Sequence, residues 1–298
     1  MVDEFWFAME VLISGLLQGF MYSLVAIGFV LIIKSSGVFN FAQGSMCLFA
    51  ALGFVSFWEA GLNFWVALGL ALVMMIVLAV VIERVVLRPL VARPPLILFM
   101  ATIGLAFLLE GLAQALWGTQ PHGLELGIPD SPLEGLPVDI SQFELFAAAI
   151  SLLLVLALVI FFHRTRVGRA LRAVSDDHEA AMSVGISLQM MWGITWAIAG
   201  GVALVAGIMW GTRLGVQYSL TLIVLKALAV LILGGFNSIT GAVVAGLIIG
   251  GSEKLVEVYL NIIFGIGGVE SFFAYALAMF VLLFRPYGLF GDEIIDRV

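Results

Sequence analysis

The sequence predicts an all-α polytopic membrane protein with about eight to nine transmembrane helices. Of its 298 residues, 63% are hydrophobic and only 11% are charged, whereas a soluble domain has roughly 45–50% apolar residues. Apolar runs of about 20 residues, the length that spans a hydrocarbon core, follow one another along the chain. The short alternating segments of a membrane β-barrel are absent from the sequence. No stretch is long enough for a soluble core, so residues 1–298 are expected to form a single transmembrane domain.

Polar breaks divide the chain into nine expected membrane-spanning helices. They cover residues 11–33, 38–58, 64–86, 96–117, 143–162, 188–211, 220–233, 241–259 and 272–284. The seventh and eighth adjoin a glycine-rich break at 234–241, which leaves the count at eight to nine. The segment before the first helix carries Asp3, Glu4 and Glu10 but no basic residue. It therefore lacks the positive start of a cleavable signal peptide, and the first helix is expected to be retained.

Basic residues determine the expected orientation, because loops rich in Lys and Arg stay on the cytoplasmic side. Ten of the thirteen fall on one side of the predicted helices: Lys34, Arg84, Arg88, Arg93, Arg164, Arg166, Arg169, Arg172, Arg285 and Arg297. The loop 118–142 falls on the other side and holds four acidic residues but no Lys or Arg. The N-terminus is therefore expected outside and the C-terminus in the cytoplasm. The loop 118–142 is expected to be an external loop, and its four prolines prevent a regular helix.

Two similar glycine-rich segments interrupt the apolar pattern at the expected inner side. Residues 37–44 (GVFNFAQG) and 234–241 (GGFNSITG) share the pattern G-x-F-N-x-x-x-G. In transporters, glycine-interrupted helices of a repeat often line the substrate path. Two ordinary turns with Asn at a helix cap would give the same pattern, so both interpretations remain open.

Motifs for catalysis and nucleotide binding are absent from the sequence. It contains no H-E-x-x-H zinc motif and no G-x-x-x-x-G-K-[ST] phosphate loop. His122, His163 and His178 fall in loops or at helix ends, and the single cysteine, Cys47, lies in an apolar stretch where a small core residue is expected. Neither a metal site nor a Cys/His nucleophile pair is predicted. The chain is therefore expected not to be an enzyme and to hold no cofactor of its own.

Few ionisable residues lie inside the expected helices, and each is a functional candidate because a charge in lipid is costly. Lys226 lies in the seventh helix and is expected to face a polar path, to pair with a carboxylate such as Glu110, or to extend toward the interface. An ion-coupled carrier usually places several carboxylates deep in its bundle. Glu110 is the one deep carboxylate that the sequence indicates, which weighs against such a carrier without excluding it.

The densest charged segment lies between the fifth and sixth expected helices, at residues 163–187. Its charged residues are Arg164, Arg166, Arg169, Arg172, Asp176, Asp177 and Glu179. Capping by Asp176 and Asp177 and a stop at Gly185 predict a short helix over 179–185. Ala180 and Ala181 would leave room for another surface, which the arginines would complement. A basic loop that merely follows the positive-inside rule would contain the same residues.

The run Glu179-Ala180-Ala181-x-x-x-Gly185 resembles the E-A-A-x-x-x-G loop with which ABC importer permeases contact their ATPase. Further stretches resemble the inner-membrane permeases of the branched-chain amino acid (LivH-like) family. They are AIGFVLI at 26–32 with GVFNFAQG at 37–44, KALAVLILGGFNSITG at 226–241, and FRPYGLFG at 284–291. The likeness covers essentially the whole chain. Gln43 stands where His is more common and Thr240 where Pro is common, which leaves the substrate open.

The resemblance implies a permease subunit of an ABC importer in the bacterial inner membrane, providing the path for a small polar solute. Branched-chain amino acids are the first expectation; urea, short amides and other amino acids are alternatives. The implied partners are a second, homologous permease in a heterodimer, two cytoplasmic ATPase subunits that bind ATP and Mg, an external substrate-binding protein and membrane lipid, with no nucleic acid. The residues implied in ATPase coupling are Arg169, Arg172, Asp176, Glu179, Ala180, Ala181 and Gly185. Those implied in the substrate path are Asn40, Gln43, Asn237, Thr240 and Lys226.

Two other functional classes remain open from the residues alone. An ion-coupled secondary carrier would act without an ATPase, and an ion gradient would drive its substrate uptake. A structural or scaffold subunit would leave every uptake activity independent of this chain.

Overall fold

The helices follow the apolar segments of the sequence. The structure, a computed structural model, describes residues 2–90, 93–133, 135, 138–265 and 267–291. Every regular element in these ranges is a helix, accompanied only by two isolated β-bridges, so the all-α prediction is confirmed. Glu134, Pro137 and Arg297, which contributed to the charge and proline patterns, lie outside the described residues.

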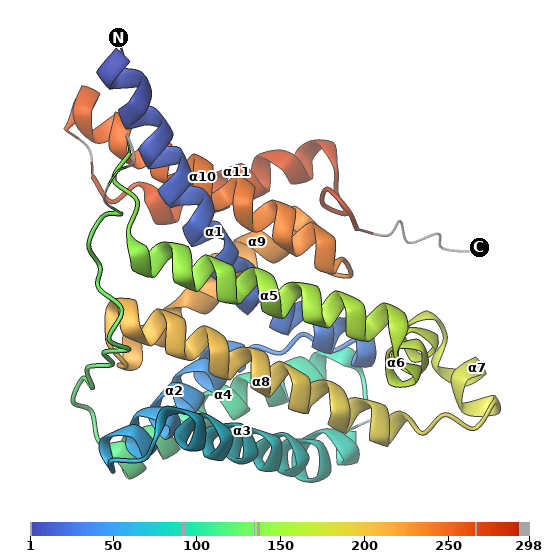
Figure 1. The fold of residues 1–298 in the computed structure, drawn as a ribbon. Helices are drawn as coiled ribbons and strands as arrows, with labels where there is room; N and C mark the ends of the chain where they lie inside the picture. The colour runs from blue at the N-terminus through green and yellow to red at the C-terminus, as the bar shows by residue number, and fades with distance from the viewer. Residues whose placement is uncertain (1, 91–92, 134, 136–137, 266, 292–298) are drawn as a thin grey trace. The chain divides into compact units, whose positions relative to one another are not determined.

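Figure 1 shows these elements in chain order. The first half contains α1 (Val2–Ser36), α2 (Gln43–Glu59), α3 (Phe64–Val81), the π-helix η1 (Ile82–Leu87), the 3₁₀-helix η2 (Arg88–Leu90), α4 (Pro95–Trp117) and α5 (Gln142–Arg164). The second half contains α6 (Arg166–Asp176), α7 (His178–Ser183), α8 (Leu188–Leu214), the 3₁₀-helix η3 (Tyr218–Leu222), α9 (Ile223–Gly234), α10 (Ile239–Phe264) and α11 (Glu270–Phe284).

Six helical stretches of the described chain are long and apolar enough to cross a membrane. They are Glu4–Ser36, Phe64–Leu90, Leu96–Trp117, Gln142–Arg164, Leu188–Leu214 and Ile239–Phe264. Two shorter apolar stretches, Tyr218–Gly234 and Phe272–Phe284, fall below that length. The chain is therefore a multi-pass membrane protein.

Two helices start later than predicted, whereas α1 starts earlier, at Val2 rather than at residue 11. The second helix was expected from residue 38, but residues 37–42 are not helical and α2 begins at Gln43. Gly37 has a φ of 65°, and the Asn40 side chain accepts a hydrogen bond from the Ala42 N–H at 3.1 Å, which closes a turn that hydropathy does not reveal. The helix expected from residue 220 starts as the 3₁₀-helix η3 and becomes α-helical only at Ile223.

The chain packs as two units, and neither is one continuous stretch. The first contains Met1–Ile27, Leu126–Leu153 and Leu225–Val298, and the second contains Gly28–Glu125 and Leu154–Val224. The division falls inside α1, inside α5 and after the first two residues of α9, so these helices contribute to both units.

The second unit is built around α2. This helix packs against α3, α4 and α8, and all of its residues from Gln43 to Val55 are buried. A methyl group at Gly207 of α8 would overlap the carbonyl oxygen of Cys47, so glycine lets the two backbones approach closely. Cys47 is free and buried, as expected for a small core residue.

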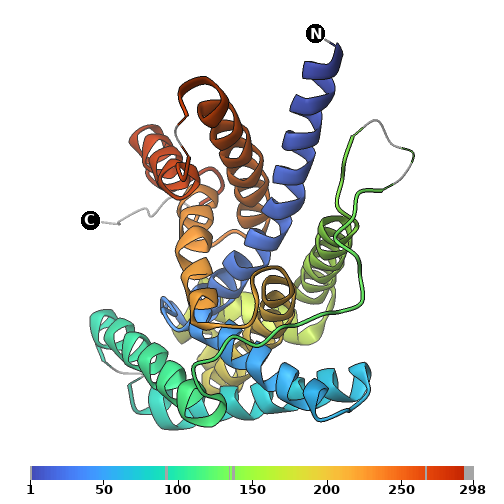
Figure 2. The ribbon, with the colours of Figure 1, turned by 90° about the vertical axis from the view of Figure 1, so that its left-hand side faces the viewer.

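The described residues between α4 and α5 form no helix, and the green trace in Figure 2 shows their course. Its first part is attached to the second unit by an antiparallel bridge between His122 and Val216. The Nδ1 atom of His122 also lies 3.2 Å from a carboxylate oxygen of Glu59. This part of the predicted external loop is therefore structured.

The first unit joins α1 to α10 through glycines on both helices. A methyl group at Gly15 would lie 2.6 Å from the Gly250 carbonyl oxygen, and one at Gly19 would lie 2.5 Å from the Gly246 carbonyl oxygen. Both pairs are spaced by four residues, so they form a continuous stripe on each helix. Only glycine allows this backbone contact. Because lipid tails are as apolar as leucine, membrane helices associate through such close packing of small residues.

Candidate functional site

The charged segment between α5 and α8 folds as two short helices. Thr165 caps α6 by accepting a hydrogen bond from the Gly168 N–H at 2.9 Å. The buried face of α6 consists of Gly168, Leu171 and Val174. On the other face Arg169 is exposed and Arg172 is half-buried. α6 is therefore an amphipathic helix that packs on its own unit and directs basic groups to the surface.

The second short helix, α7, is capped at its N-terminus by Asp177. Its Oδ1 atom accepts hydrogen bonds from the N–H groups of Glu179 at 2.8 Å and Ala180 at 3.0 Å. Of the two acids predicted to cap this helix, Asp177 does so, whereas Asp176 is the exposed last residue of α6. The cap places a carboxylate at the positive end of α7.

Gly185 ends α7 as predicted. It has a φ of 87° and donates its N–H to the Met182 carbonyl at 3.0 Å, and the next N–H, from Ile186, bonds to the Ala181 carbonyl at 3.0 Å. A left-handed residue in this position favours glycine. The helix predicted over residues 179–185 lies at His178–Ser183.

The exposed face of α7 combines charged and apolar side chains. Glu179 and Ala180 are exposed, but Ala181 is only 3% exposed. The expectation that both alanines offer room to another surface is therefore wrong for Ala181, which packs inward. Met182 is 51% exposed and Val184 is 74% exposed. Sequence reasoning missed these two, although apolar residues within such a polar segment were a usable signal.

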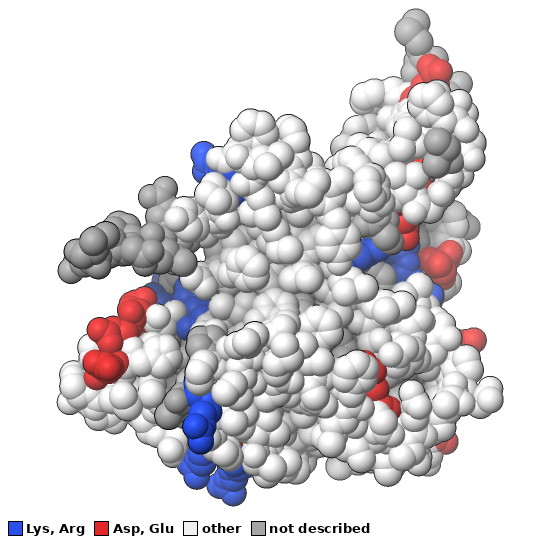
Figure 3. Space-filling view, turned by 180° about the vertical axis from the view of Figure 1, so that it is seen from behind, with Lys and Arg blue, Asp and Glu red and all other residues white. Residues whose placement is uncertain are grey.

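Figure 3 shows acidic side chains gathered where α7 lies, with basic side chains near them. The exposed acidic residues of this segment are Asp176, Asp177 and Glu179, and the exposed basic ones are Arg164, Arg166 and Arg169. Charges of both signs can orient a partner, and the apolar side chains between them can be buried by it. We call residues 163–187 the docking segment below.

The first of the two glycine-rich segments, residues 37–44, places two amides in the interior of the second unit. Asn40 and Gln43 are both 0% exposed, and the Asn40 amide donates to the Gln43 Oε1 at 3.2 Å. A Cβ at Gly28 would overlap the Gln43 side chain. The Gln43 Nε2 has no hydrogen-bond partner among the described residues. Such a buried donor is costly unless water or a ligand satisfies it.

The second segment, residues 234–241, lies in the first unit and differs from the first in exposure. Asn237 and Thr240 are both exposed. Ser238 caps α10 by accepting from the Gly241 N–H at 2.9 Å, and Gly235 has a φ of 101°. Both segments contain a break between two helices, a point that the sequence left open, and their four predicted path residues are divided between the two units.

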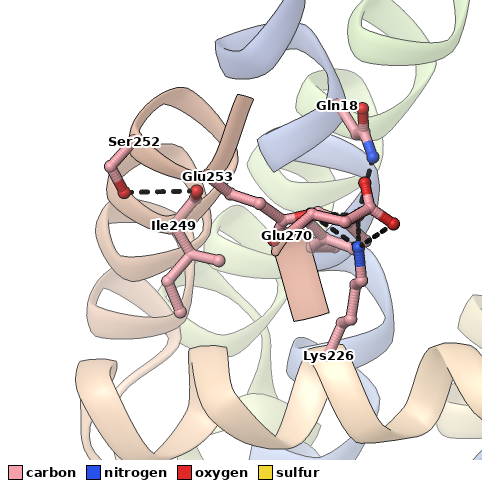
Figure 4. A network of polar contacts seen from close by, with 7 residues as sticks. Gln18, Lys226, Ile249, Ser252, Glu253 and Glu270 are labelled. Atoms are coloured by element: carbon pink, nitrogen blue, oxygen red, sulfur yellow. Dashed lines mark hydrogen bonds and ion pairs between the residues drawn. The ribbon is translucent and has the colours of Figure 1, made fainter. Parts of the chain in front are cut away.

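Lys226 lies at the centre of a polar cluster in the first unit (Figure 4). Its Nζ atom is 2.5 Å from Glu253 Oε1, 3.1 Å from Glu270 Oε1 and 3.1 Å from the Tyr22 hydroxyl. The Gln18 amide donates to the same hydroxyl at 2.6 Å. The cluster thus connects α1, α9, α10 and α11. The partners of Lys226 are Glu253 and Glu270 rather than Glu110, which accepts a hydrogen bond from Ser45 at 2.8 Å.

Sequence reasoning missed Glu253 as a deep carboxylate. It is 2% exposed, and its Oε2 atom has no hydrogen-bond partner among the described residues. It lies inside the helix expected at 241–259, but the sequence indicated only Glu110 as a deep carboxylate. The usable signal was periodicity, because Glu253 continues the buried stripe of Ala242, Ala245, Gly246 and Ile249.

The described residues contain no group of three or more His, Cys, Asp or Glu side chains arranged to hold a metal ion.

The chain is similar to known proteins over most or all of its length. Residues 11–284 match the family model described as branched-chain amino acid transport system / permease component. The chain is 28% identical to the high-affinity branched-chain amino acid transport system permease protein LivH of Escherichia coli K12, over 100% of both chains. It is 27% identical to the corresponding protein BraD of Pseudomonas aeruginosa, again over 100% of both.

A solved structure is similar in fold. It is described as an inward-facing conformation of a metal-chelate type ABC transporter and matches with a TM-score of 0.50 at 14% identity, over 93% of this chain and 87% of that one. At this identity the likeness concerns the fold alone. The match to the family model spans nearly the whole membrane region, and the chain therefore belongs to the family of branched-chain amino acid transport system permease components.

Proposed function

We propose that this chain is the permease subunit of an ATP-binding-cassette importer and provides the path for branched-chain amino acids across a bacterial inner membrane. The observation that carries the proposal is the match of residues 11–284 to the permease family. The relatives named for branched-chain amino acid transport are similar over their full lengths. Urea, short amides or other amino acids are the alternative substrates within the same importer class.

The energy for transport comes from separate subunits in this proposal. The chain has no phosphate-loop motif, so two cytoplasmic ATPases bind ATP and Mg, and the chain itself holds no cofactor. A second, homologous permease completes a heterodimer, and an external binding protein delivers the substrate. No nucleic acid takes part.

The docking segment is the proposed contact with the ATPase. Glu179, Ala180, Met182 and Val184 are all exposed, in or directly after a short helix whose two ends are fixed by Asp177 and Gly185. A preorganised short helix loses little conformational entropy on binding. Arg169, Arg172 and Asp176 lie on the neighbouring helix α6, whereas Ala181 lies on the buried side of α7.

The proposed substrate path uses the two helix breaks and the polar cluster. The buried Nε2 of Gln43, which lacks a partner among the described residues, supports a role for Gln43 and its neighbour Asn40. Asn237 and Thr240 stand exposed at the second break. Lys226 supplies a cation beside the path, balanced by its two carboxylates.

The proposed topology has nine membrane helices with the N-terminus outside and the C-terminus in the cytoplasm. The six long helices need three more crossings to reach nine, and α2, the η3–α9 stretch and α11 are the apolar elements that supply them. Short and broken helices are tolerated at membrane depth where protein surrounds them. The positive-inside rule gives the direction.

The test is reconstitution of the complete importer in liposomes with the Glu179→Lys variant of this chain. The reversed charge faces the proposed ATPase contact, so leucine uptake and substrate-stimulated ATP hydrolysis should fall at least about tenfold, the effect of a lost charge-assisted contact of about 1.4 kcal/mol. Co-purification of the ATPase with the permease should fall in parallel, whereas membrane insertion should be unchanged.

The matched control is Glu125→Lys, which makes the same charge change in the exposed external loop. It should leave co-purification of the ATPase intact. Normal uptake by the Glu179→Lys importer would refute the docking assignment. Competition of leucine uptake by unlabelled amino acids, urea and short amides identifies the substrate. Accumulation driven by an ion gradient, with this chain alone in liposomes, would instead support a secondary carrier.

A further inference from the structure

A surface cavity of about 380 Å³ opens in the second unit where α3 ends and α8 begins. The residues of its lining that matter below are Glu83, Arg84 and Arg88 from η1 and η2, and Ser187, Gln189 and Met190 from the start of α8. None of these residues belongs to the proposed substrate path. We infer that this cavity binds the phosphate headgroup of an anionic membrane lipid in the inner leaflet.

Two arginines and one glutamate determine the charge of the cavity. Arg88 is held in place: its Nη2 donates to the Gln189 Oε1 at 2.5 Å, and its Nε lies 3.6 Å from Glu83 Oε1. The charge of Glu83, which is 5% exposed, is thereby offset. Arg84 is exposed and makes no ion pair in the described part of the chain, so the cavity carries a net positive charge.

The backbone around the cavity also favours a negatively charged ligand. The π-helix η1 brings the Arg88 N–H onto the Glu83 carbonyl, five residues earlier, and π-turns of this kind often accompany functional sites. Across the cavity begins α8, a helix of 27 residues capped by Ser187. The N-terminus of a helix favours an anion, because its first N–H groups and its dipole point there.

The surroundings of the cavity identify the anion as a lipid. Val81 is 49% exposed, Val85 67% and Met190 63%, and the whole stretch Phe64–Leu90 is apolar enough to cross a membrane yet mostly exposed. An acyl chain can lie along this face while its phosphate enters the cavity. Basic pockets between membrane helices on the cytoplasmic side recognise lipid headgroups in this way. A free phosphate ion would make no use of the apolar face.

The test is lipid binding to the purified full-length chain, measured by native mass spectrometry during titration with phosphatidylglycerol or phosphatidylcholine. Phosphatidylglycerol should bind more tightly, and Arg84→Gln should weaken its binding about fivefold, the effect expected from one arginine near an anionic headgroup. Arg84→Lys, which keeps the charge, should retain most of the affinity. Arg93→Gln is the matched control, because Arg93 is an exposed residue of the same basic group but does not line the cavity.

Equal losses for Arg84→Gln and Arg93→Gln would overturn the inference in favour of general attraction to basic loops. Displacement of the lipid by millimolar inorganic phosphate would overturn the lipid assignment. Both results are independent of transport, and only the placement of the lipid in the inner leaflet rests on the proposed topology. Arg84 is exposed, so Arg84→Gln should elute as the folded protein in size-exclusion chromatography. If Arg84→Gln does not fold, the lipid affinity of Arg84→Lys still tests the site at the same position.

Discussion

Lys226 contacts two carboxylates with a single positive charge. Its own side chain is 16% exposed, that of Glu253 3% and that of Glu270 39%. A buried ion pair contributes little net stability, but removing one member leaves an uncompensated charge in a medium of low dielectric constant. Tyr22 and Gln18 add hydrogen bonds to the same group of atoms. The cluster therefore holds the helices of the first unit in one arrangement.

The three charged residues should differ in their effect on stability. Lys226→Met should destabilise the protein by about 3–5 kcal/mol, because Glu253 and Glu270 then face each other without a cation. Glu253→Gln should lower the stability less, because Lys226 keeps its ion pair with Glu270. Glu270→Gln should cost least, because Glu270 is partly exposed and its pair is screened by solvent. Thermal unfolding of the purified variants in detergent measures this order.

Lys254→Met is the control for this series, because Lys254 lies next to Glu253 and makes no ion pair in the described part of the chain. Combining Lys226→Met with Glu253→Gln should cost less than the sum of the two single changes. Additive losses would contradict the cluster. The sequence singled out Lys226 as a charge in an apolar helix, but not its partners, because nothing local indicates which distant carboxylate turns toward it.

At the scale of the element, two kinds of feature could be predicted from sequence with different success. The ends of α7 follow from local chemistry, an aspartate cap and a left-handed glycine, and both were predicted. The start of α2 at Gln43 was not, because Val38, Phe39 and Phe41 are apolar whether or not the backbone is helical. Hydropathy reports burial in lipid or protein, and it does not report backbone conformation.

The glycine contact between α1 and α10 gives a prediction at this scale. Gly19→Ala places a methyl group 2.5 Å from the Gly246 carbonyl oxygen, so the helices must separate, at a cost of about 1–3 kcal/mol. The control is Gly69→Ala in α3, where the new methyl group meets nothing within 4 Å. That change should be neutral or stabilising by up to about 1 kcal/mol, since alanine is the better helix former. The melting temperature in detergent should therefore fall for Gly19→Ala and stay the same or rise for Gly69→Ala, and a Gly19→Ala protein as stable as the original would refute the contact.

For the whole molecule, the all-α class and the permease family could both be predicted from sequence, because hydropathy and short motifs are properties of the chain itself. The division into two interleaved units could not, because α1 and α5 are each continuous in sequence and yet contribute to both units. The same holds for the cavity beside η1. Its two sides, around Arg84 and Gln189, meet only through tertiary packing.

The proposed orientation of the chain leads to a prediction that uses its single cysteine. Cys47 is 4% exposed, so the unmodified protein should react poorly with a membrane-impermeant maleimide. Phe5→Cys and Glu125→Cys, at exposed positions in the first turns of α1 and in the predicted external loop, should be labelled in intact spheroplasts. Tyr287→Cys, exposed after α11, should be labelled only after the membrane is permeabilised, because the proposed orientation places Arg285 and the other basic residues in the cytoplasm. Labelling of Tyr287→Cys in intact spheroplasts would show that α11 runs in the opposite direction. The N- and C-termini would then lie on the same side, and the proposal of nine crossings would be wrong.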